Sequence, residues 1–159
     1  MNTDTSKKTF LLVEGALMIA MAFVLSYIKL YDMPMGGSIT LEMIPLVIMG
    51  LRHGVKWGTF TAAVHGIIQL ILGFSNVMYC ATIPAMIGCV LLDYLFAFTV
   101  LGLAGLFLPL FKNKLIGAAV GTAICGALRF LCSFLSGWLL WGSYAPKGWS
   151  VVYYSLIYK

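Results

Sequence analysis

Charged residues are scarce in this chain of 159 residues, and their scarcity excludes most soluble folds. Only 9% of the residues are charged, whereas 62% are hydrophobic and the mean hydropathy is +1.00. Soluble domains are about 25% charged and about 45–50% apolar. Because a soluble core of this size cannot bury so much apolar surface, the sequence predicts a protein surrounded mostly by lipid.

The chain also lacks the motifs that mark common enzymes and metal sites. It has no HExxH, no GxSxG, no glutamate-rich motif of an intramembrane protease and no phosphate-binding Gly-rich loop with a lysine. Its four cysteines show no CxxC spacing and three lie in apolar runs, which favours packing over disulfide or metal roles. We expect no enzymatic activity, no catalytic residue, no metal, no cofactor and no nucleic-acid partner.

Long continuous apolar runs are present instead, and they lack the ten-residue alternation of a membrane β-barrel. At roughly 20 residues per crossing, the length allows five or six transmembrane helices. We expect an all-α bundle in a single domain, 1–159, with five complete helices and a truncated sixth. The expected helices cover about 10–30, 41–51, 57–72, 82–108 and 115–141, with the sixth beginning near 149 and a loop at 74–80.

The basic residues set the orientation of the bundle. A cytoplasmic N-terminus leaves only Lys29 and Lys147 outside. It places six basic residues in the cytoplasm, namely Lys7, Lys8, Arg52, Lys56, Lys112 and Lys114. Cytoplasmic loops carry an excess of lysine and arginine, so the sequence predicts this orientation.

Two isolated charges, Asp93 and Arg129, lie far from the ends of the fourth and fifth expected helices. An ionised side chain there costs about 2.5–3.5 kcal/mol, so each needs a partner or a wet cavity. One interpretation is a structural Asp93–Arg129 ion pair between the two helices. The other makes Asp93 the counter-anion of a cationic ligand. Tyr94 could face either lipid or the site, and spacing alone does not decide.

The fifth expected helix carries a slowly drifting face on which Arg129, Ser133, Gly137 and Trp141 recur every four residues. Gly137, one turn below the Trp141 ring, leaves a concavity, although small residues also serve ordinary helix packing. Tyr154 and two neighbouring tyrosines follow. They fit an interfacial aromatic belt or an aromatic cage around a cation.

Ala16 and Ala20 form a small-xxx-small pair on the first expected helix, where another helix can approach closely. The pattern alone favours a partner helix within the chain over one from another subunit. Glu42 and Pro45 place a charge and a kink near the start of the second helix. His65 has no obvious partner in the sequence, and we interpret it as an interhelical histidine.

Several blocks in order resemble the thiamine-specific substrate-binding (S) component of energy-coupling factor (ECF) vitamin transporters. They are EGALMIAMAF, MPMGGSITLEMIPLVIMGLRHGVKWG, LLDYLFAFTVLGLAGLF, and GSYAPKGW followed by YSLIY. The resemblance spans nearly the whole chain. It implies six helices in the bacterial plasma membrane, an outward-facing thiamine pocket, and energy from a separate transmembrane coupling subunit with two ATPase subunits.

The resemblance also assigns roles to single residues. It implies an acidic-aromatic pair at Asp93 and Tyr94, with aspartate where glutamate is usual. It further implies pocket positions at Gly137, Trp141 and Tyr154 and a contact of Ala16 and Ala20 with the coupling subunit, which raises the intersubunit interpretation above the internal one. Two ligand-binding positions depart from the family pattern, because Ser133 stands where relatives carry histidine and Lys159 where they carry asparagine.

Three functions follow from these residues. The first is an S component that captures thiamine. The second is an S component with a changed ligand, since an ammonium at Lys159 would repel cationic thiamine and lacks the donor–acceptor pair of an amide. The third is a truncated membrane scaffold that binds no ligand.

Overall fold

The structure is a computed structural model, which describes residues 3–32, 38–78, 82–140 and 150. The first half contains α1 (Thr3–Ser26), β1 (Lys29–Asp32), β2 (Ser38–Thr40), α2 (Met43–His53), α3 (Val55–Leu72) and α4 (Phe74–Met78). The second half contains α5 (Ile83–Cys89), the π-helix η1 (Val90–Phe96), α6 (Ala97–Thr99), the 3₁₀ helix η2 (Val100–Leu110) and α7 (Lys114–Leu140).

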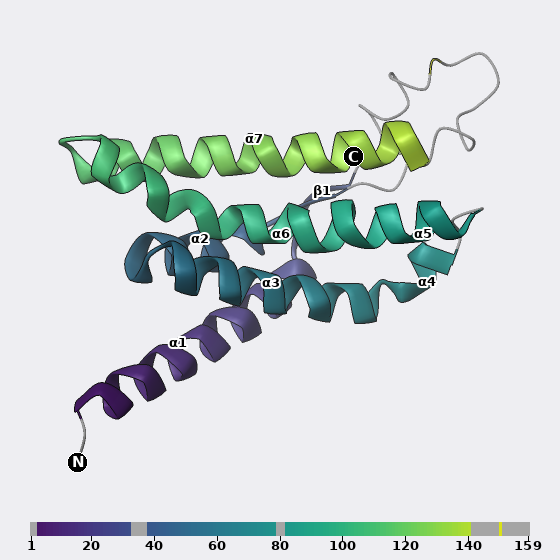
Figure 1. Ribbon diagram of the computed structural model, residues 1–159. Helices are drawn as coiled ribbons and strands as arrows, with labels where there is room; N and C mark the ends of the chain where they lie inside the picture. Colours follow the sequence, from purple (N-terminus) through teal and green to yellow (C-terminus); the bar gives the residue numbers. More distant parts are fainter. Residues whose placement is uncertain (1–2, 33–37, 79–81, 141–149, 151–159) are drawn as a thin grey trace.

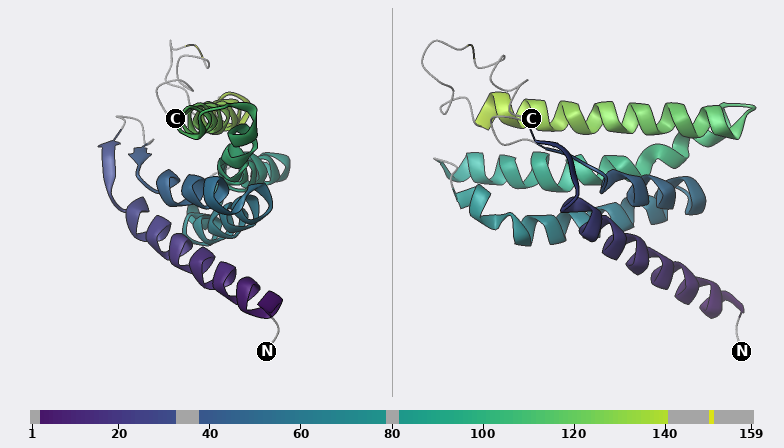
Figure 2. Two further views of the ribbon diagram at one scale, coloured as in Figure 1. Left: turned by 90° about the vertical axis from the view of Figure 1, so that its left-hand side faces the viewer. Right: turned by 180° about the vertical axis from the view of Figure 1, so that it is seen from behind.

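The helices form layers around the long rod that runs from α5 to η2 (Figures 1 and 2). This rod packs against α7 on one side and against α2 and α3 on the other. α1 packs on α2 and α3 and crosses them obliquely at the edge of the bundle. The buried core therefore lies where the rod meets α2 and α3, with Leu46, Ala62, Leu101 and Ala104 among its residues.

Within the described residues, four segments are long and apolar enough to cross a membrane. They are Ser6–Ser26, Val55–Leu72, Ile83–Leu110 and Lys114–Leu139. α2 is apolar but shorter, and its 11 residues correspond to about 16 Å of helix, or half of a hydrocarbon core about 30 Å thick. The predicted all-α membrane bundle is confirmed. The expected sixth helix near 149 lies outside the described residues, apart from Ser150.

Three local features differ from the sequence-based expectation. The first helix ends at Ser26, and the chain then forms an antiparallel hairpin in which Lys29 pairs with Thr40 and Asp32 with Ser38. The segment expected to be a loop, 74–80, contains the short helix α4. The expected helix 82–108 has a continuous path, but its hydrogen bonding changes from α to π and then to 3₁₀.

Glycines let three helices approach closely at the crossing of α2, α3 and η2. A Cβ added at Gly50 would lie 2.6 Å from the carbonyl oxygen of Gly102, and one added at Gly58 would lie 2.8 Å from that same oxygen. Small residues bring backbones together in this way in membrane bundles, where apolar burial gives little drive for association. Gly54, with φ of 82°, makes the tight turn from α2 to α3.

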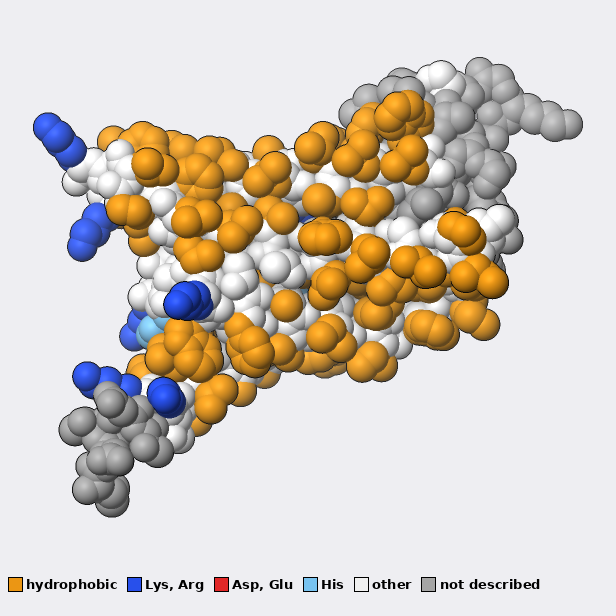
Figure 3. Space-filling view, viewed as in Figure 1, with side chains coloured by type: hydrophobic (Ala, Val, Ile, Leu, Met, Phe, Trp, Pro, Cys, Tyr) orange, Lys and Arg blue, Asp and Glu red, His pale blue; other side chains and the backbone are white. Residues whose placement is uncertain are grey.

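Basic side chains gather at the end of the bundle where α1 begins (Figure 3). The same view shows hydrophobic side chains over most of the visible length of the helices. Exposed large apolar residues occur on α1, α3, α5 and α7, including Leu17, Ile71, Ile83 and Leu139. Such a surface suits lipid, and the grouping of charge agrees with a cytoplasmic N-terminus.

Candidate functional site

Asp93 lies on the π-helix η1 and faces α7. The hydroxyl of Ser136 donates a hydrogen bond of 2.6 Å to Asp93 Oδ2, and the thiol of Cys89 lies 3.5 Å from the same oxygen. Ser136 is completely buried, whereas Asp93 is half-buried. π-Helical stretches are rare and frequently occur at functional sites. An acidic group is thus held at the interface between two membrane-spanning segments.

Arg129 forms its ion pair with Glu42, so the interpretation of Asp93 and Arg129 as a structural ion pair is wrong. Its Nη2 lies 2.7 Å from Glu42 Oε1. The guanidinium also lies over the ring of Phe98, with its Cζ 4.4 Å from the ring centroid. Arg129 therefore pairs with the carboxylate just before α2 and packs on the rod, which leaves the interpretation of Asp93 as a ligand anion.

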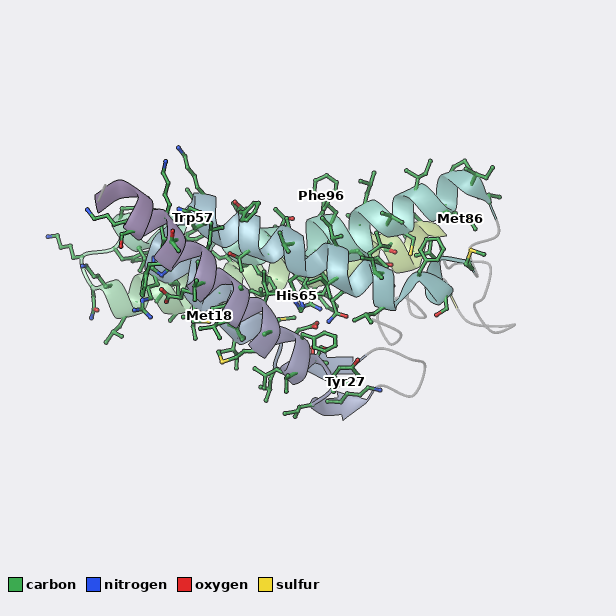
Figure 4. All side chains as sticks on the ribbon, turned by 90° about the horizontal axis from the view of Figure 1, so that it is seen from below. Met18, Tyr27, Trp57, His65, Met86 and Phe96 are labelled. Atoms are coloured by element: carbon green, nitrogen blue, oxygen red, sulfur yellow. The ribbon has the colours of Figure 1, made fainter. Side chains whose placement is uncertain are left out.

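Four polar side chains from three elements form what we call the Glu42 cluster: Glu42, His65, Gln69 and Arg129. Gln69 donates a hydrogen bond of 2.7 Å to Glu42 Oε2, and His65 Nε2 lies 3.5 Å from that oxygen. His65 is fully buried and packs edge-on against Phe98, with ring centroids 5.1 Å apart. In Figure 4 it lies in the middle of the bundle.

The Glu42 cluster is the part of the site region that sequence reasoning did not find. Glu42 was noted only as a charge near a helix entrance, and His65 only as an interhelical residue. A signal was present, because His65 and Gln69 are four residues apart on α3 and so share one face of an apolar helix. The partner helices, however, could not be inferred from that spacing.

Asp93 and Glu42 each bond to α7, at two different heights along its axis. Arg129 and Ser136 are seven residues apart, which corresponds to roughly 10 Å along a helix. Arg129 lies near the middle of α7, so α2, which begins just after Glu42, starts at about half the depth of the bundle. Non-helical backbone at such depth occurs where it is buried in protein or lines a water-filled cavity. The hairpin before α2 is such backbone.

The other predicted site residues have different places. Tyr94 donates a hydrogen bond of 3.2 Å to the carbonyl oxygen of Gly73, at the C-terminal end of α3. Ser133 is half-buried on α7, and Gly137 is buried next to Ser136. The remaining three, Trp141, Tyr154 and Lys159, lie outside the described residues. The structure therefore brings Asp93 together with the Ser136–Gly137 turn of α7.

Two further features lie away from Asp93. A groove of about 370 Å³ at the basic end is lined by Leu12, Lys56, Trp57 and Phe60, and Figure 4 shows Trp57 beside the first half of α1. None of the predicted site residues lines it. Ala16 and Ala20 are both exposed on α1. Their small side chains leave that face of α1 open to a close approach by another helix.

The fold and the site define a multi-pass membrane protein with two acidic groups between its helices, the buried Glu42 and the half-buried Asp93. The family model described as "Thiamine transporter protein (Thia_YuaJ)" matches residues 12–159. This chain belongs to that family, which confirms the resemblance found in its sequence blocks and the transporter class. It is a multi-pass protein of the bacterial plasma membrane.

Individual relatives agree with this assignment. "Thiamine transporter ThiT" of Bacillus subtilis (strain 168) is 36% identical over 167 residues, covering 98% of this chain and 83% of the relative. The protein of the same name from Lacticaseibacillus paracasei is 30% identical over 160 residues, covering 95% and 78%. A solved structure of ThiT from Listeria monocytogenes is 26% identical, with a TM-score of 0.74 over 96% of this chain and 84% of that one.

Proposed function

We propose that this chain is the substrate-binding membrane subunit of an ECF-type vitamin transporter and that it captures thiamine from outside the cell. The observation that carries the proposal is Asp93, an acidic group kept at the η1–α7 interface by the hydroxyl of Ser136, while Arg129 pairs with Glu42. Thiamine is a cation, and a carboxylate in a low-dielectric site attracts a cation strongly. Membership of the thiamine transporter family supports the choice of ligand.

The remaining roles follow the family pattern. Asp93 is the counter-anion, Trp141 the stacking surface, and Gly137 leaves space for the ligand. Tyr94, Ser133, Tyr154 and Lys159 complete the predicted ligand-binding set. Tyr94 has a second use, since its hydroxyl bonds to Gly73. No cofactor takes part in the proposed binding step.

Delivery of the ligand requires other subunits in this proposal. A transmembrane coupling subunit packs against Ala16 and Ala20, and two ATPase subunits supply the energy. The exposure of both alanines on α1 supports that surface. Rocking of the whole bundle in the membrane then carries the bound vitamin toward the cytoplasm.

The test is equilibrium binding of labelled thiamine to the purified protein in detergent. Saturable binding at micromolar ligand is expected, and its absence would contradict the proposal. Asp93→Asn removes the charge and should weaken binding by about 1.5–3 kcal/mol, or roughly ten- to a hundredfold in Kd. Ser133→Ala, on α7, should have a smaller effect. Equal losses in the two variants would remove the role of Asp93 as counter-anion.

A changed ligand is the second candidate, and the departures at Ser133 and Lys159 favour it. The same binding assay separates the two. Competition by unlabelled thiamine alone supports thiamine as the ligand. Stronger competition by the isolated pyrimidine or thiazole half, or by an anionic vitamin, supports an S component with another specificity.

A further inference from the structure

We propose that Ser136 is a positioning residue that holds the Asp93 carboxylate in one orientation for the ligand. The inference rests on the proposed function, because it concerns the affinity of the same site. Nothing in the sequence pattern marks Ser136, since it is not one of the residues that recur every four positions along α7.

The geometry of this contact is that of a strong hydrogen bond. The distance of 2.6 Å between Ser136 Oγ and Asp93 Oδ2 falls in the range for a hydroxyl bonded to a charged carboxylate. Cys89 approaches the same oxygen at 3.5 Å, but a thiol is a weak donor. Of these two contacts, the bond from Ser136 is the stronger.

Ser136 behaves differently from three threonines of the helices. Helical serine and threonine commonly bond to a carbonyl three or four residues earlier in their own helix. Thr59, Thr99 and Thr122 do so, with contacts of 2.6–2.8 Å to the residue four positions earlier. The hydroxyl of Ser136 instead crosses to η1, 43 residues away in sequence.

This crossing matters because Asp93 lies in a membrane-spanning segment. A carboxylate bonded to a neighbouring helix points in a fixed direction, whereas one that faces solvent can rotate. Because Ser136 is fully buried, the bond does not compete with water and also limits rotation of the carboxylate.

The experiment compares thiamine binding by the wild-type chain, Ser136→Ala, Asp93→Asn and the double variant. Ser136→Ala should raise Kd about tenfold, the expected scale for losing a hydrogen bond to a charged group. Ser136→Thr, which keeps the hydroxyl, should stay within about threefold of wild type on the same scale. Thr122→Ala, on the same helix but bonded to its own backbone, is the control and should leave Kd unchanged.

The double variant separates positioning from packing. If Ser136 acts through the carboxylate, Ser136→Ala should change Kd less than about twofold in the Asp93→Asn background. An undiminished effect there would mean that Ser136 only fills space, and the inference would be overturned. Wild-type binding with an unchanged Kd in Ser136→Ala would overturn it while leaving the proposed function intact. No binding by the wild type overturns both.

Discussion

At the scale of single residues, the buried ion pair between Glu42 and Arg129 has more partners than an isolated salt bridge. Arg129 occupies one carboxylate oxygen of Glu42 at 2.7 Å, and Gln69 occupies the other at 2.7 Å. Glu42 is only 5% exposed. Removing one member of such a pair leaves a charge with little compensation, which is much costlier than losing a surface pair.

We therefore expect Arg129→Met to destabilise the protein by about 3–5 kcal/mol, because it leaves the Glu42 carboxylate buried. The change in stability is measured by thermal unfolding in detergent, monitored as the loss of the monodisperse peak. Arg52→Met is the matched control. Arg52 also pairs with a glutamate, Glu14, at 2.8 Å, but 60% of the Arg52 side chain is exposed and His53 Nε2 remains 2.8 Å from the other Glu14 oxygen, so about 0–1 kcal/mol is expected.

The double variant Glu42→Gln/Arg129→Met completes this test. It should regain part of the lost stability, since neither residue then leaves an unpaired charge. Equal losses of stability for Arg129→Met and Arg52→Met would show that the Glu42 cluster does not carry the stability assigned to it.

The sequence predicted the chemistry of some site residues but not their partners. Asp93 and Arg129 stood out because a charge in a long apolar run is costly and needs compensation. Their pairing could not be inferred, because the partner of Arg129 is 87 residues away and that of Asp93 is a serine. Serine is common in membrane helices, so only the approach of α7 to η1 distinguishes Ser136.

At the scale of elements, the closest helix contacts depend on glycines that leave no room for a side chain. A Cβ built on Gly102 would overlap the backbone of Gly58 and Thr59 in α3. A Cβ built on Gly126, in α7, meets no atom within 4 Å. The same substitution, glycine to alanine, would therefore meet a crowded backbone at Gly102 and open space at Gly126.

Gly102→Ala should lower stability by about 1–3 kcal/mol, because the added methyl group pushes η2 away from α3. Gly126→Ala should be neutral or stabilising by up to about 1 kcal/mol, since alanine has the higher helix propensity. Comparing the melting temperatures of both variants with wild type gives the result. A loss at Gly126 as large as that at Gly102 would contradict the packing argument.

The sequence predicted where the long helices lie, but not the hydrogen-bonding pattern within them. Long apolar runs located the crossing segments, because each must satisfy its backbone hydrogen bonds internally. The same runs could not reveal the π and 3₁₀ stretches between Val90 and Leu110, since these leave the apolar pattern unchanged. The hairpin and α4 were missed because local turn residues did not determine tertiary pairing.

At the scale of the whole molecule, the charge distribution gives the bundle a direction. The predicted cytoplasmic side holds Lys7 and Lys8 in α1, Arg52 and Lys56 around the α2–α3 turn, and Lys112 and Lys114 near the start of α7. Lys29, after α1, lies on the opposite side in that prediction. The orientation of the bundle in the membrane can be tested by labelling one residue on each side.

We expect Lys29→Cys to react with a membrane-impermeant maleimide in intact cells, and Lys112→Cys to react only after permeabilisation. Both lysines are exposed, so accessibility depends on the side of the membrane. The unsubstituted chain, with its four cysteines, gives the background labelling. Labelling of Lys112→Cys in intact cells would reverse the predicted orientation.

The long separation between Glu42 and Arg129 also has a consequence for biosynthesis. The ribosome delivers Glu42 to the membrane 87 residues before its arginine, so α2 meets lipid while its acid has no guanidinium partner. An unpaired acid at depth costs about 2.5–3.5 kcal/mol, and α2 is too short to cross by itself. Stable insertion of α2 should therefore wait for α7, and assembly of this chain should be completed late, after the last described helix has left the ribosome.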